Sequence, residues 1–331
     1  MNTKKKIRWG ILGTGRIAHK LAEAIKCSED GELYAAASRS TAKAEAFAAE
    51  YGIKKAFGSY ESLAADPDID IVYIATPMSS HYDDSMLCMR HGKHVLCEKS
   101  VALNSKSVEE MLKFAREKNL FFMEAMWMKC RPAYLKALEW ARSGKIGDLQ
   151  TVRADFCNLV PYDKNDRVFR ADCGGGALLD LGVYTITFAA DFLGHEPSEI
   201  VTSARIGQCG TDFYDSINLI YPGGAFADLS ASFDFPCTNR AAVIGSEGSI
   251  LFGDWFLCCG EVSLYNKNSV LTEKFASEDK VNGYEYEIDE VNRCLASGLC
   301  ESPLVPHSST AAVMRIMDAC RSRWGLVFPG E

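Results

Sequence analysis

The sequence has no apolar run of the ~20 residues that a helix needs to span a bilayer. No apolar core of a signal peptide follows the stretch from Met1 to Lys6. Basic runs are also missing beyond the lysines of that stretch, and the formal net charge is −8. These absences argue against a membrane or a nucleic acid as partner, and we expect a protein of the cytoplasm.

Pairs of the type C-x-x-C are absent from the thirteen cysteines, whose number is odd. Scattered cysteines without redox or metal-ligand spacing are typical of reduced thiols in a core. Cys258 and Cys259 are adjacent, and we expect them in an apolar strand; a metal or redox role is the weaker alternative. The sequence therefore predicts no metal site.

What is present begins with an apolar strand from Ile7 that runs into the turn Gly13-Thr14-Gly15-Arg16-Ile17-Ala18 and then into a helix. Gly13 permits a tight turn, and Gly15 lets the backbone approach a pyrophosphate. Ala18 allows the helix to lie close to the strand. Similar glycines also occur in ordinary strand-to-helix turns, but further strand-helix units follow here. The turn predicts a dinucleotide site with the cofactor contacts Gly13, Thr14, Gly15, Arg16 and Ile17.

The second strand, Leu33 to Ala37, ends in Ser38-Arg39-Ser40 without a carboxylate. NAD sites commonly hold the ribose 2′-hydroxyl with an acidic residue at this point. An arginine here suits a 2′-phosphate instead, so Ser38 and Arg39 predict NADP, with NAD as the alternative. The alternative interpretation is that Arg39 is a solvated arginine in a loop and binds no cofactor.

Two later strands end in polar residues at the same predicted sheet edge. Ile69 to Ala75 is followed by Thr76, Pro77 and His81, which we expect to contact the cofactor, although His81 could instead cap the next helix. His94 to Cys97 is followed by Glu98 and Lys99, which place an ammonium group beside the expected nicotinamide. A surface ion pair is the alternative for Glu98 and Lys99.

Strand and helix stop alternating after residue 125. We therefore expect a Rossmann domain with a parallel, doubly wound sheet over 1–125, and an α+β domain over 126–331. Residues 199–265 read as successive strands without helices between them, which predicts a mostly antiparallel open sheet. One face of that sheet would remain to be buried, so we expect a homodimer or homotetramer through it.

The second domain contains Gly174-Gly175-Gly176 at the start of a predicted helix that extends to about Leu193. Asp180 and Tyr184 are four residues apart and would share a face of that helix. Gly182 inside the helix indicates that something packs closely there. If no other functional residues lie opposite them, Asp180 and Tyr184 would form only a local hydrogen bond within the helix.

Taken together, these motifs resemble the Gfo/Idh/MocA family of nicotinamide-dependent oxidoreductases over essentially the whole chain. The branch with trans-1,2-dihydrobenzene-1,2-diol dehydrogenase and NADP-dependent D-xylose 1-dehydrogenase is the most similar. The resemblance rests on the glycine turn, Glu98-Lys99, Asp180-x-Gly182-x-Tyr184, Gly283-Tyr284-x-x-Glu287 with Ser302-Pro303, and, for the branch, Glu124 to Met128 and Gly174 to Asp180. Ser100 stands where the family usually has proline, which predicts a looser turn after Lys99.

The resemblance implies that Tyr184 meets Lys99 at the nicotinamide and acts as acid or base while hydride moves to or from a sugar or cyclic diol. A phenol has an ordinary pKa of about 10, and a nearby ammonium favours the phenolate. Lys99 would tune the tyrosine and bind the substrate oxygen. Asp180 would orient a substrate hydroxyl or the tyrosine, and Trp127 would form an apolar wall.

Two other functions compete with this dehydrogenase. A sensor or regulatory protein of the same fold would bind NADP without turnover, but such a protein has no need for Lys99 and Tyr184. Glycoside cleavage with bound nicotinamide is known in the family, and no residue here specifically supports it. The predicted function is an NADP-dependent dehydrogenase for a small sugar or diol.

Overall fold

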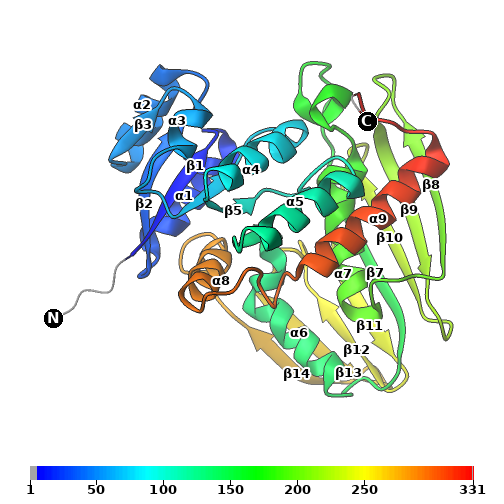
Figure 1. Cartoon of the computed structure of the whole chain (residues 1–331). Helices are drawn as coiled ribbons and strands as arrows, with labels where there is room; N and C mark the ends of the chain where they lie inside the picture. Colours follow the sequence, from blue (N-terminus) through cyan, green and yellow to red (C-terminus); the bar gives the residue numbers. More distant parts are fainter. Residues whose placement is uncertain (1–5, 330) are drawn as a thin grey trace. The chain divides into compact units, whose positions relative to one another are not determined.

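The computed structural model describes residues 6–329 and residue 331. The chain forms two compact units, each described separately below (Figure 1). Unit 1 consists of Met1–Ala102, Lys106–Trp127 and Asp279–His307. Unit 2 consists of Leu103–Ser105, Met128–Glu278 and Ser308–Glu331. Unit 1 therefore includes, besides the expected N-terminal segment, a stretch near the C-terminus.

Unit 1 is built on a six-stranded sheet in which every neighbouring pair is parallel. The strand order is β3-β2-β1-β4-β5-β6, in which the direction of winding reverses between β1 and β4. This confirms the predicted doubly wound sheet, and adds the short edge strand β3, which the sequence did not indicate. The strands are β1 Ile7–Leu12, β2 Gly31–Ala37, β3 Lys55–Phe57, β4 Ile71–Ile74, β5 His94–Cys97 and β6 Phe122–Glu124.

The strands of this sheet are nearly continuous apolar runs because helices cover them; for example, all four residues of β4 are buried. The helix α8 comes from the late segment of the chain and packs on α1. The helices of unit 1 are α1 Arg16–Cys27, α2 Thr41–Tyr51, α3 Tyr60–Ala64, α4 His81–Arg90, α5 Ser105–Glu117, whose first residue belongs to unit 2, and α8 Glu285–Ala296.

Unit 2 contains an eight-stranded sheet in the order β14-β13-β12-β11-β7-β10-β9-β8. All neighbouring pairs are antiparallel except β7 and β10, which confirms the predicted mostly antiparallel sheet. The strands are β7 Leu149–Cys157, β8 Glu199–Ile206, β9 Asp212–Ile220, β10 Phe226–Ser232, β11 Ala241–Gly245, β12 Gly248–Phe252, β13 Glu261–Asn266 and β14 Leu271–Ala276.

Two details of this sheet differ from the sequence-based prediction. Strand β14 was not expected, because its residues Leu271–Ala276 include exposed charges and lie at the sheet edge. The expectation that Cys258 and Cys259 form part of a strand is wrong, since both lie in the turn between β12 and β13. Backbone N–H groups of both cysteines bond back to Trp255 and close that turn.

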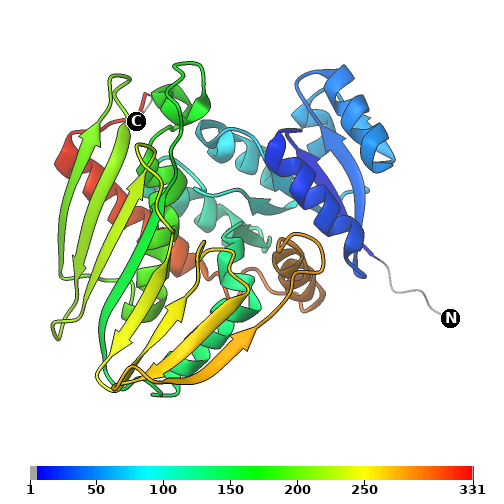
Figure 2. The ribbon, with the colours of Figure 1, turned by 180° about the vertical axis from the view of Figure 1, so that it is seen from behind.

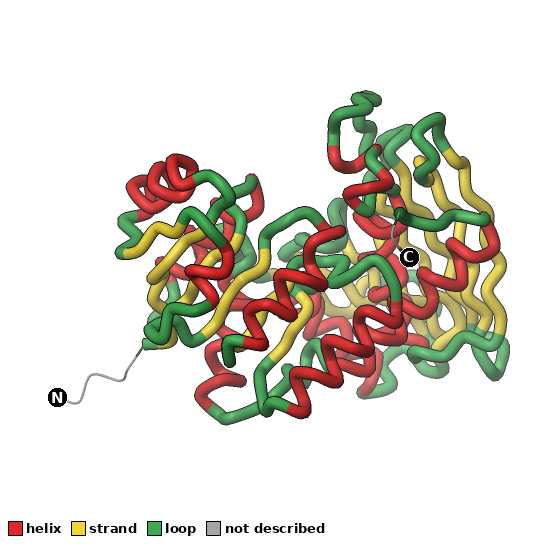
Figure 3. Tube along the Cα trace, turned by 45° about the horizontal axis from the view of Figure 1, so that its top comes forward, coloured by secondary structure: helices red, strands yellow, loops and turns green. Residues whose placement is uncertain are grey.

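The helices of unit 2 lie on one face of its sheet, and none of the described helices of this unit lies on the other face (Figure 2). Figure 3 shows the same one-sided arrangement in a tilted view. The helices are α6 Pro132–Arg142, α7 Val183–Leu193 and α9 His307–Trp324, whose first residue belongs to unit 1. Strand residues on the helix side are buried, and those on the opposite side, such as Arg153 and Asp155 of β7, are exposed.

A buried polar cluster joins the three helices of unit 2. The Lys129 ammonium lies 2.7 Å from an Asp191 carboxylate oxygen of α7 and 3.2 Å from the Ser309 hydroxyl of α9. The other oxygen of Asp191 accepts a hydrogen bond of 2.7 Å from the Tyr134 hydroxyl of α6. Because the buried charges compensate each other, the cluster specifies how these helices pack.

The segment Ala171–Leu193 is, by length and composition, apolar enough to cross a membrane, contrary to the expectation that no segment would be. Its apolar window is 83% buried inside the protein, as in a core helix. All thirteen cysteines are free, and six of them are buried. Within residues 6–329 and 331, no group of three or more His, Cys, Asp or Glu side chains could hold a metal ion.

Candidate active site

The turn after β1 fits a dinucleotide phosphate. Gly13 has a φ of +97°, and a Cβ there would lie 2.9 Å from the Ala75 carbonyl oxygen. A Cβ on Gly15 would meet only that oxygen, at 4.0 Å. Gly15 is also the N-cap of α1, with no side-chain cap and no acidic residue in the first helical turn. The backbone N–H groups at the start of α1, which follow Thr14 and Gly15 and include those of Arg16 and Ile17, can therefore bind a phosphate. No carboxylate in the first turn of the helix competes for them.

The end of β2 carries a cation and no carboxylate. Ser38 is buried and Arg39 is exposed, directly after Ala37. Burial raises the pKa of the Tyr60 hydroxyl, and Arg39, which faces that hydroxyl, partly opposes the shift. The residues at this strand end thus fit a 2′-phosphate, which the guanidinium can bind through two N–H groups.

His81 is buried and joins two loops that follow neighbouring strands. Its Nδ1 lies 2.8 Å from the Ser100 carbonyl oxygen, and its Nε2 lies 2.9 Å from the Thr76 carbonyl oxygen. Carbonyl oxygens only accept, so both contacts are hydrogen bonds at once when both ring nitrogens carry hydrogen. The imidazole thus fastens the Thr76 and Ser100 loops together, while its predicted contact with the cofactor stays a prediction.

The turn after Lys99 is held without the family proline. Ser100 is fully buried, its carbonyl faces His81, and the Lys99–Ser100 peptide bond is cis. The Thr76 hydroxyl donates a hydrogen bond of 2.7 Å to Asp84 of α4, which holds the loop on the other side of His81. These hydrogen bonds hold the loops on both sides of His81, and the looser turn expected from Ser100 stays a prediction.

The three consecutive glycines of unit 2, Gly174 to Gly176, make room for the buried carboxylate of Asp212. The Leu178 N–H donates to Asp212 Oδ2 at 2.6 Å. A Cβ on Gly176, whose φ is +130°, would lie 2.2 Å from Asp212 Oδ1. A Cβ on Gly175 would lie 2.7 to 2.8 Å from three backbone atoms. Asp212 was not among the predicted site residues, because it is distant in sequence from the glycines that make room for it.

The predicted regular helix begins with a π turn over Leu178–Gly182 and continues as α7. Asp180 lies in this turn, 3.6 Å from an Arg167 guanidinium nitrogen. A Cβ on Gly182 would lie 3.1 Å from Leu178 Cδ1 and 3.6 Å from the Ala231 side chain of β10, which confirms the expected close packing. Single π turns within helices occur frequently at functional sites of proteins.

Tyr184 is buried among aromatic side chains of unit 2. Its ring packs edge-on against Phe156 of β7, with centroids 5.6 Å apart. Phe156 in turn contacts Trp255, half-exposed and with a φ of +58°, at 6.2 Å. Phe156 and Trp255 were not among the predicted site residues, because isolated aromatics in a strand and a loop carry no spacing signal.

In unit 1, Trp127 stacks on Tyr284 with ring centroids 4.4 Å apart and an angle of 17° between the planes. The segment beside Tyr284 wraps around the carboxylate of Glu285. Four backbone N–H groups donate to it over 2.7 to 3.2 Å, those of Lys280, Val281, Asn282 and Gly283. Trp127 thus has a rigid aromatic support.

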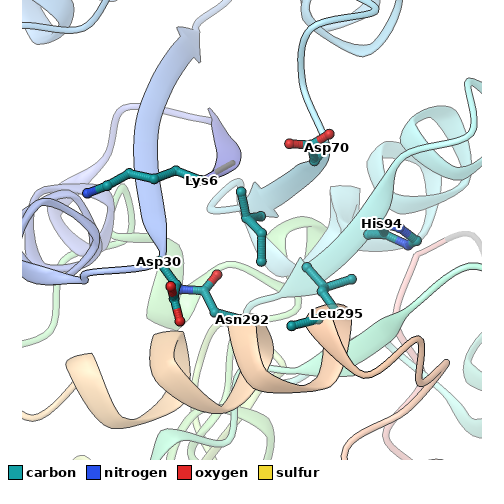
Figure 4. A pocket seen from close by; sticks show the side chains of 8 residues that line it. Lys6, Asp30, Asp70, His94, Asn292 and Leu295 are labelled. Atoms are coloured by element: carbon teal, nitrogen blue, oxygen red, sulfur yellow. The ribbon is translucent and has the colours of Figure 1, made fainter. Parts of the chain in front are cut away.

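A pocket of about 380 Å³ lies at the opposite, amino edge of the parallel sheet (Figure 4). None of the predicted site residues lines it, and ligands of such sheets bind at the carboxyl edge. The pocket is therefore separate from the candidate site. Its walls include Lys6, Asp30, Asp70, His94, Asn292 and Leu295.

Comparison with known proteins agrees with this geometry. Residues 7–126 match the Gfo/Idh/MocA model described as an oxidoreductase family with an NAD-binding Rossmann fold, and residues 134–251 match the C-terminal domain of that family. The chain belongs to the Gfo/Idh/MocA oxidoreductase family. The predicted enzyme class, an NAD(P)-dependent dehydrogenase, and the predicted two-part fold are thereby confirmed.

The family members similar to this chain include named dehydrogenases. It is 34% identical over 329 residues to trans-1,2-dihydrobenzene-1,2-diol dehydrogenase of Xenopus laevis, covering 97% of this chain and 99% of that protein. The Homo sapiens protein of the same name is 33% identical over 333 residues, covering 98% and 99%. The resemblance to this branch is thus confirmed.

Solved structures of the family superpose closely. KijD10, a 3-ketoreductase from Actinomadura kijaniata in complex with NADP and TDP-benzene, has a TM-score of 0.86 at 26% identity, covering 96% of this chain and 98% of that one. Aldose-aldose oxidoreductase from Caulobacter crescentus has a TM-score of 0.87 at 23% identity, covering 97% and 98%, and supports the fold alone. Lys99 and Tyr184 belong to different units here, so their catalytic pairing stays a prediction.

Two glutamates of α8 should affect stability with opposite pH dependence. Burial, reinforced by nearby Glu98, raises the pKa of Glu287 well above its usual range. Burial acts in the same direction on Glu285, but its backbone donors outweigh it and lower that pKa. The folded state therefore holds an extra proton on Glu287 above pH ~4.5, which costs up to about 1.4 kcal/mol per pH unit until its folded pKa is reached.

We expect Glu287→Gln to gain stability relative to the wild type as pH rises from 5 to 8. Glu285→Gln should be less stable than the wild type by a nearly constant amount over this range, because the Glu285 carboxylate already stabilises the fold above its unfolded pKa. That difference should shrink only as pH falls below about 4.5. Melting temperatures of the wild type and both variants, measured from acid to pH 8, test the two dependences. Parallel curves for the wild type and Glu287→Gln would contradict a protonated Glu287.

Proposed function

We propose that this oxidoreductase transfers hydride between NADP and a hydroxyl-bearing carbon of a sugar or cyclic diol. The observation that carries the proposal is the position of Lys99, two residues after the end of β5 at the carboxyl edge of a dinucleotide-binding sheet. Because parallel strands end at one edge, the glycine turn after β1 opens onto the same edge. The diol dehydrogenases with which the chain shares a third of its residues support the substrate class.

In the proposed mechanism, the bound dinucleotide supplies the hydride acceptor or donor. Tyr184 takes or gives the proton of the substrate hydroxyl, and Lys99 binds that oxygen and stabilises the phenolate. The mechanism requires that these two side chains meet at the substrate. Asp180, already facing Arg167, orients a substrate hydroxyl or the tyrosine.

The proposed substrate site is aromatic with few polar groups. In unit 2, Phe156 packs on Tyr184 and on Trp255. In unit 1, Tyr284 stacks on Trp127. Flat aromatic walls suit a ring, and the Asp180–Arg167 pair offers an acceptor and donors for its hydroxyls. This combination favours a cyclic diol or a pyranose over a long or highly charged substrate.

We expect Tyr184→Phe to lower kcat about 10²- to 10⁴-fold, the range that general acid-base catalysis contributes. Lys99→Met should lower it by a similar factor. The measurement is NADPH formation with trans-1,2-dihydrobenzene-1,2-diol and with D-xylose. The controls are Tyr214→Phe, on the helix-free side of β9, and Lys113→Met, whose side chain is exposed on α5.

Near-wild-type turnover in either Tyr184→Phe or Lys99→Met would refute the assignment. A wild-type protein that binds NADPH but oxidises or reduces no member of an aldose and dihydrodiol panel would instead support the sensor alternative.

We propose that Arg39 selects NADP by binding its 2′-phosphate, as the NADP complex of KijD10 supports for the cofactor itself. Arg39→Asp should raise the Kd for NADP roughly 10- to 100-fold, the loss of one hydrogen-bonded charge pair, and should favour NAD. Titration with both dinucleotides measures the change, and Arg116→Asp on α5 is the control. An unchanged ratio of the two Kd values would rule out this role.

We propose a homodimer or homotetramer that buries the helix-free face of the second sheet. Large apolar side chains are exposed on that face, namely Val201 of β8, Phe226 of β10 and Leu251 of β12. Such a face is stabilised when a second copy covers it. Light scattering should give a multiple of the chain mass, which Phe226→Asp with Leu251→Asp lowers and Val327→Asp does not. A monomeric wild type would exclude this assembly.

We also propose that the protein works in the cytoplasm. Its support is the set of thirteen free thiols, six of them buried, which a reducing compartment preserves. Cell fractionation with an antibody to the protein tests this location.

A further inference from the structure

The carboxylate of Glu98 is held by two donors in unit 1. The Tyr73 hydroxyl donates to its Oε1, and the Lys99 backbone N–H donates to its Oε2 at 3.2 Å. Tyr73, on β4, is fully buried, and Glu98 is 8% exposed. A side chain of β4 thus reaches across to the residue that follows β5 and, through it, to the backbone of the candidate catalytic lysine.

A second carboxyl group lies nearby without any such donor. Glu287, in the first turn of α8, is fully buried, and neither of its side-chain oxygens has a hydrogen-bond partner in the described part of the chain. An ionised carboxylate in that position would cost several kcal/mol, so the group keeps its proton. Burial and the neighbouring Glu98 charge accordingly raise the pKa of Glu287.

Two other titratable groups near this pair keep their protons. Burial and then Glu98 raise the pKa of the Tyr73 hydroxyl well above its usual range. Burial likewise raises the pKa of the Cys97 thiol on β5, although Ser85 opposes it. The titratable groups that face the pair or its neighbours include Tyr73 from β4, Asp84 from α4, Cys97 from β5, Glu124 from β6 and Tyr284 just before α8.

We propose that Tyr73 and Glu98 are positioning residues for Lys99, with Glu98 as the only ionised member of the Glu98–Glu287 pair. Glu98 binds the peptide N–H from which the Lys99 side chain begins, and Tyr73 fixes the carboxylate that does so. Glu287 keeps its proton because it lacks donors, which leaves one negative charge beside Lys99. The inference rests on the proposed function only in that Lys99 acts at the dinucleotide.

The decisive experiment is a double-mutant cycle on NADPH binding, measured by nicotinamide fluorescence without substrate. Tyr73→Phe should raise the Kd about tenfold, since it deletes one hydrogen bond to a charged group at nearly constant volume. In a Lys99→Ala background, Tyr73→Phe should change the Kd for NADPH little further, because Tyr73 acts on NADPH binding only by positioning Lys99. A full tenfold loss in both backgrounds would show that Tyr73 does not act through Lys99.

Tyr34→Phe is the matched control. The Tyr34 hydroxyl also donates to a carboxylate, Asp68 at 3.0 Å, but Asp68 precedes β4 and lies at the amino edge of the sheet. We expect its NADPH Kd to equal that of the wild type. Melting temperatures of all variants separate a local effect from unfolding.

The two glutamine variants test the charge assignment. Glu98→Gln should raise the Kd about tenfold and shift the pH profile of kcat/KM for the dihydrodiol, whereas Glu287→Gln, a neutral mimic of a protonated acid, should change the Kd less than about twofold. The reverse order would overturn the assignment. If the wild-type protein bound no NADPH, the proposed function would be refuted. If it bound NADPH and the effects of Tyr73→Phe and Lys99→Ala on the Kd were additive, only the positioning role would be refuted.

Discussion

Parallel strands of one sheet end at one edge, and the candidate cofactor site depends on that constraint. The order β3-β2-β1-β4-β5-β6 brings Gly13, Arg39, Thr76 and Lys99 to the carboxyl ends of β1, β2, β4 and β5. No two of these residues are close in sequence. The winding reverses between β1 and β4, which leaves room at that edge for a ligand between the glycine turn and the loop after β4.

Buried carboxylates recur where the candidate residues are held, and their donors determine which of them are charged. Glu285 has four backbone N–H donors, Glu98 has a phenol and a peptide N–H, and Glu287 has none. In unit 2, Asp212 accepts the Leu178 N–H, whereas burial and Asp212 raise the pKa of its neighbour Asp215. Burial also raises the pKa of Asp212, although the Leu178 N–H opposes the shift, so donors and desolvation compete at each of these carboxyl groups.

The local motifs could be predicted because the residues that determine their conformation and chemistry are adjacent in the sequence. A turn that needs positive φ and open space demands glycine, which is why Gly13 and Gly15 were recognisable. Alternation of strand and helix gave the parallel sheet for a similar reason. Asp212, Phe156, Trp255 and Arg167 were missed because their partners lie elsewhere in the chain, and nothing in their own neighbourhood distinguishes them. Cys258 and Cys259 were misplaced because apolar character alone does not separate a strand from a buried turn.

By itself, the sequence determined the strand-helix alternation, the glycine turn, the arginine that replaces a carboxylate after β2, and the family to which the chain belongs, since each depends on side chains next to one another. Only the tertiary structure decided that α8 joins the first unit, that the triple glycine admits Asp212, and that His81 and Tyr73 hold the loops around Lys99. Those outcomes depend on hydrogen bonds and close packing between distant segments, which exist only after the chain has folded.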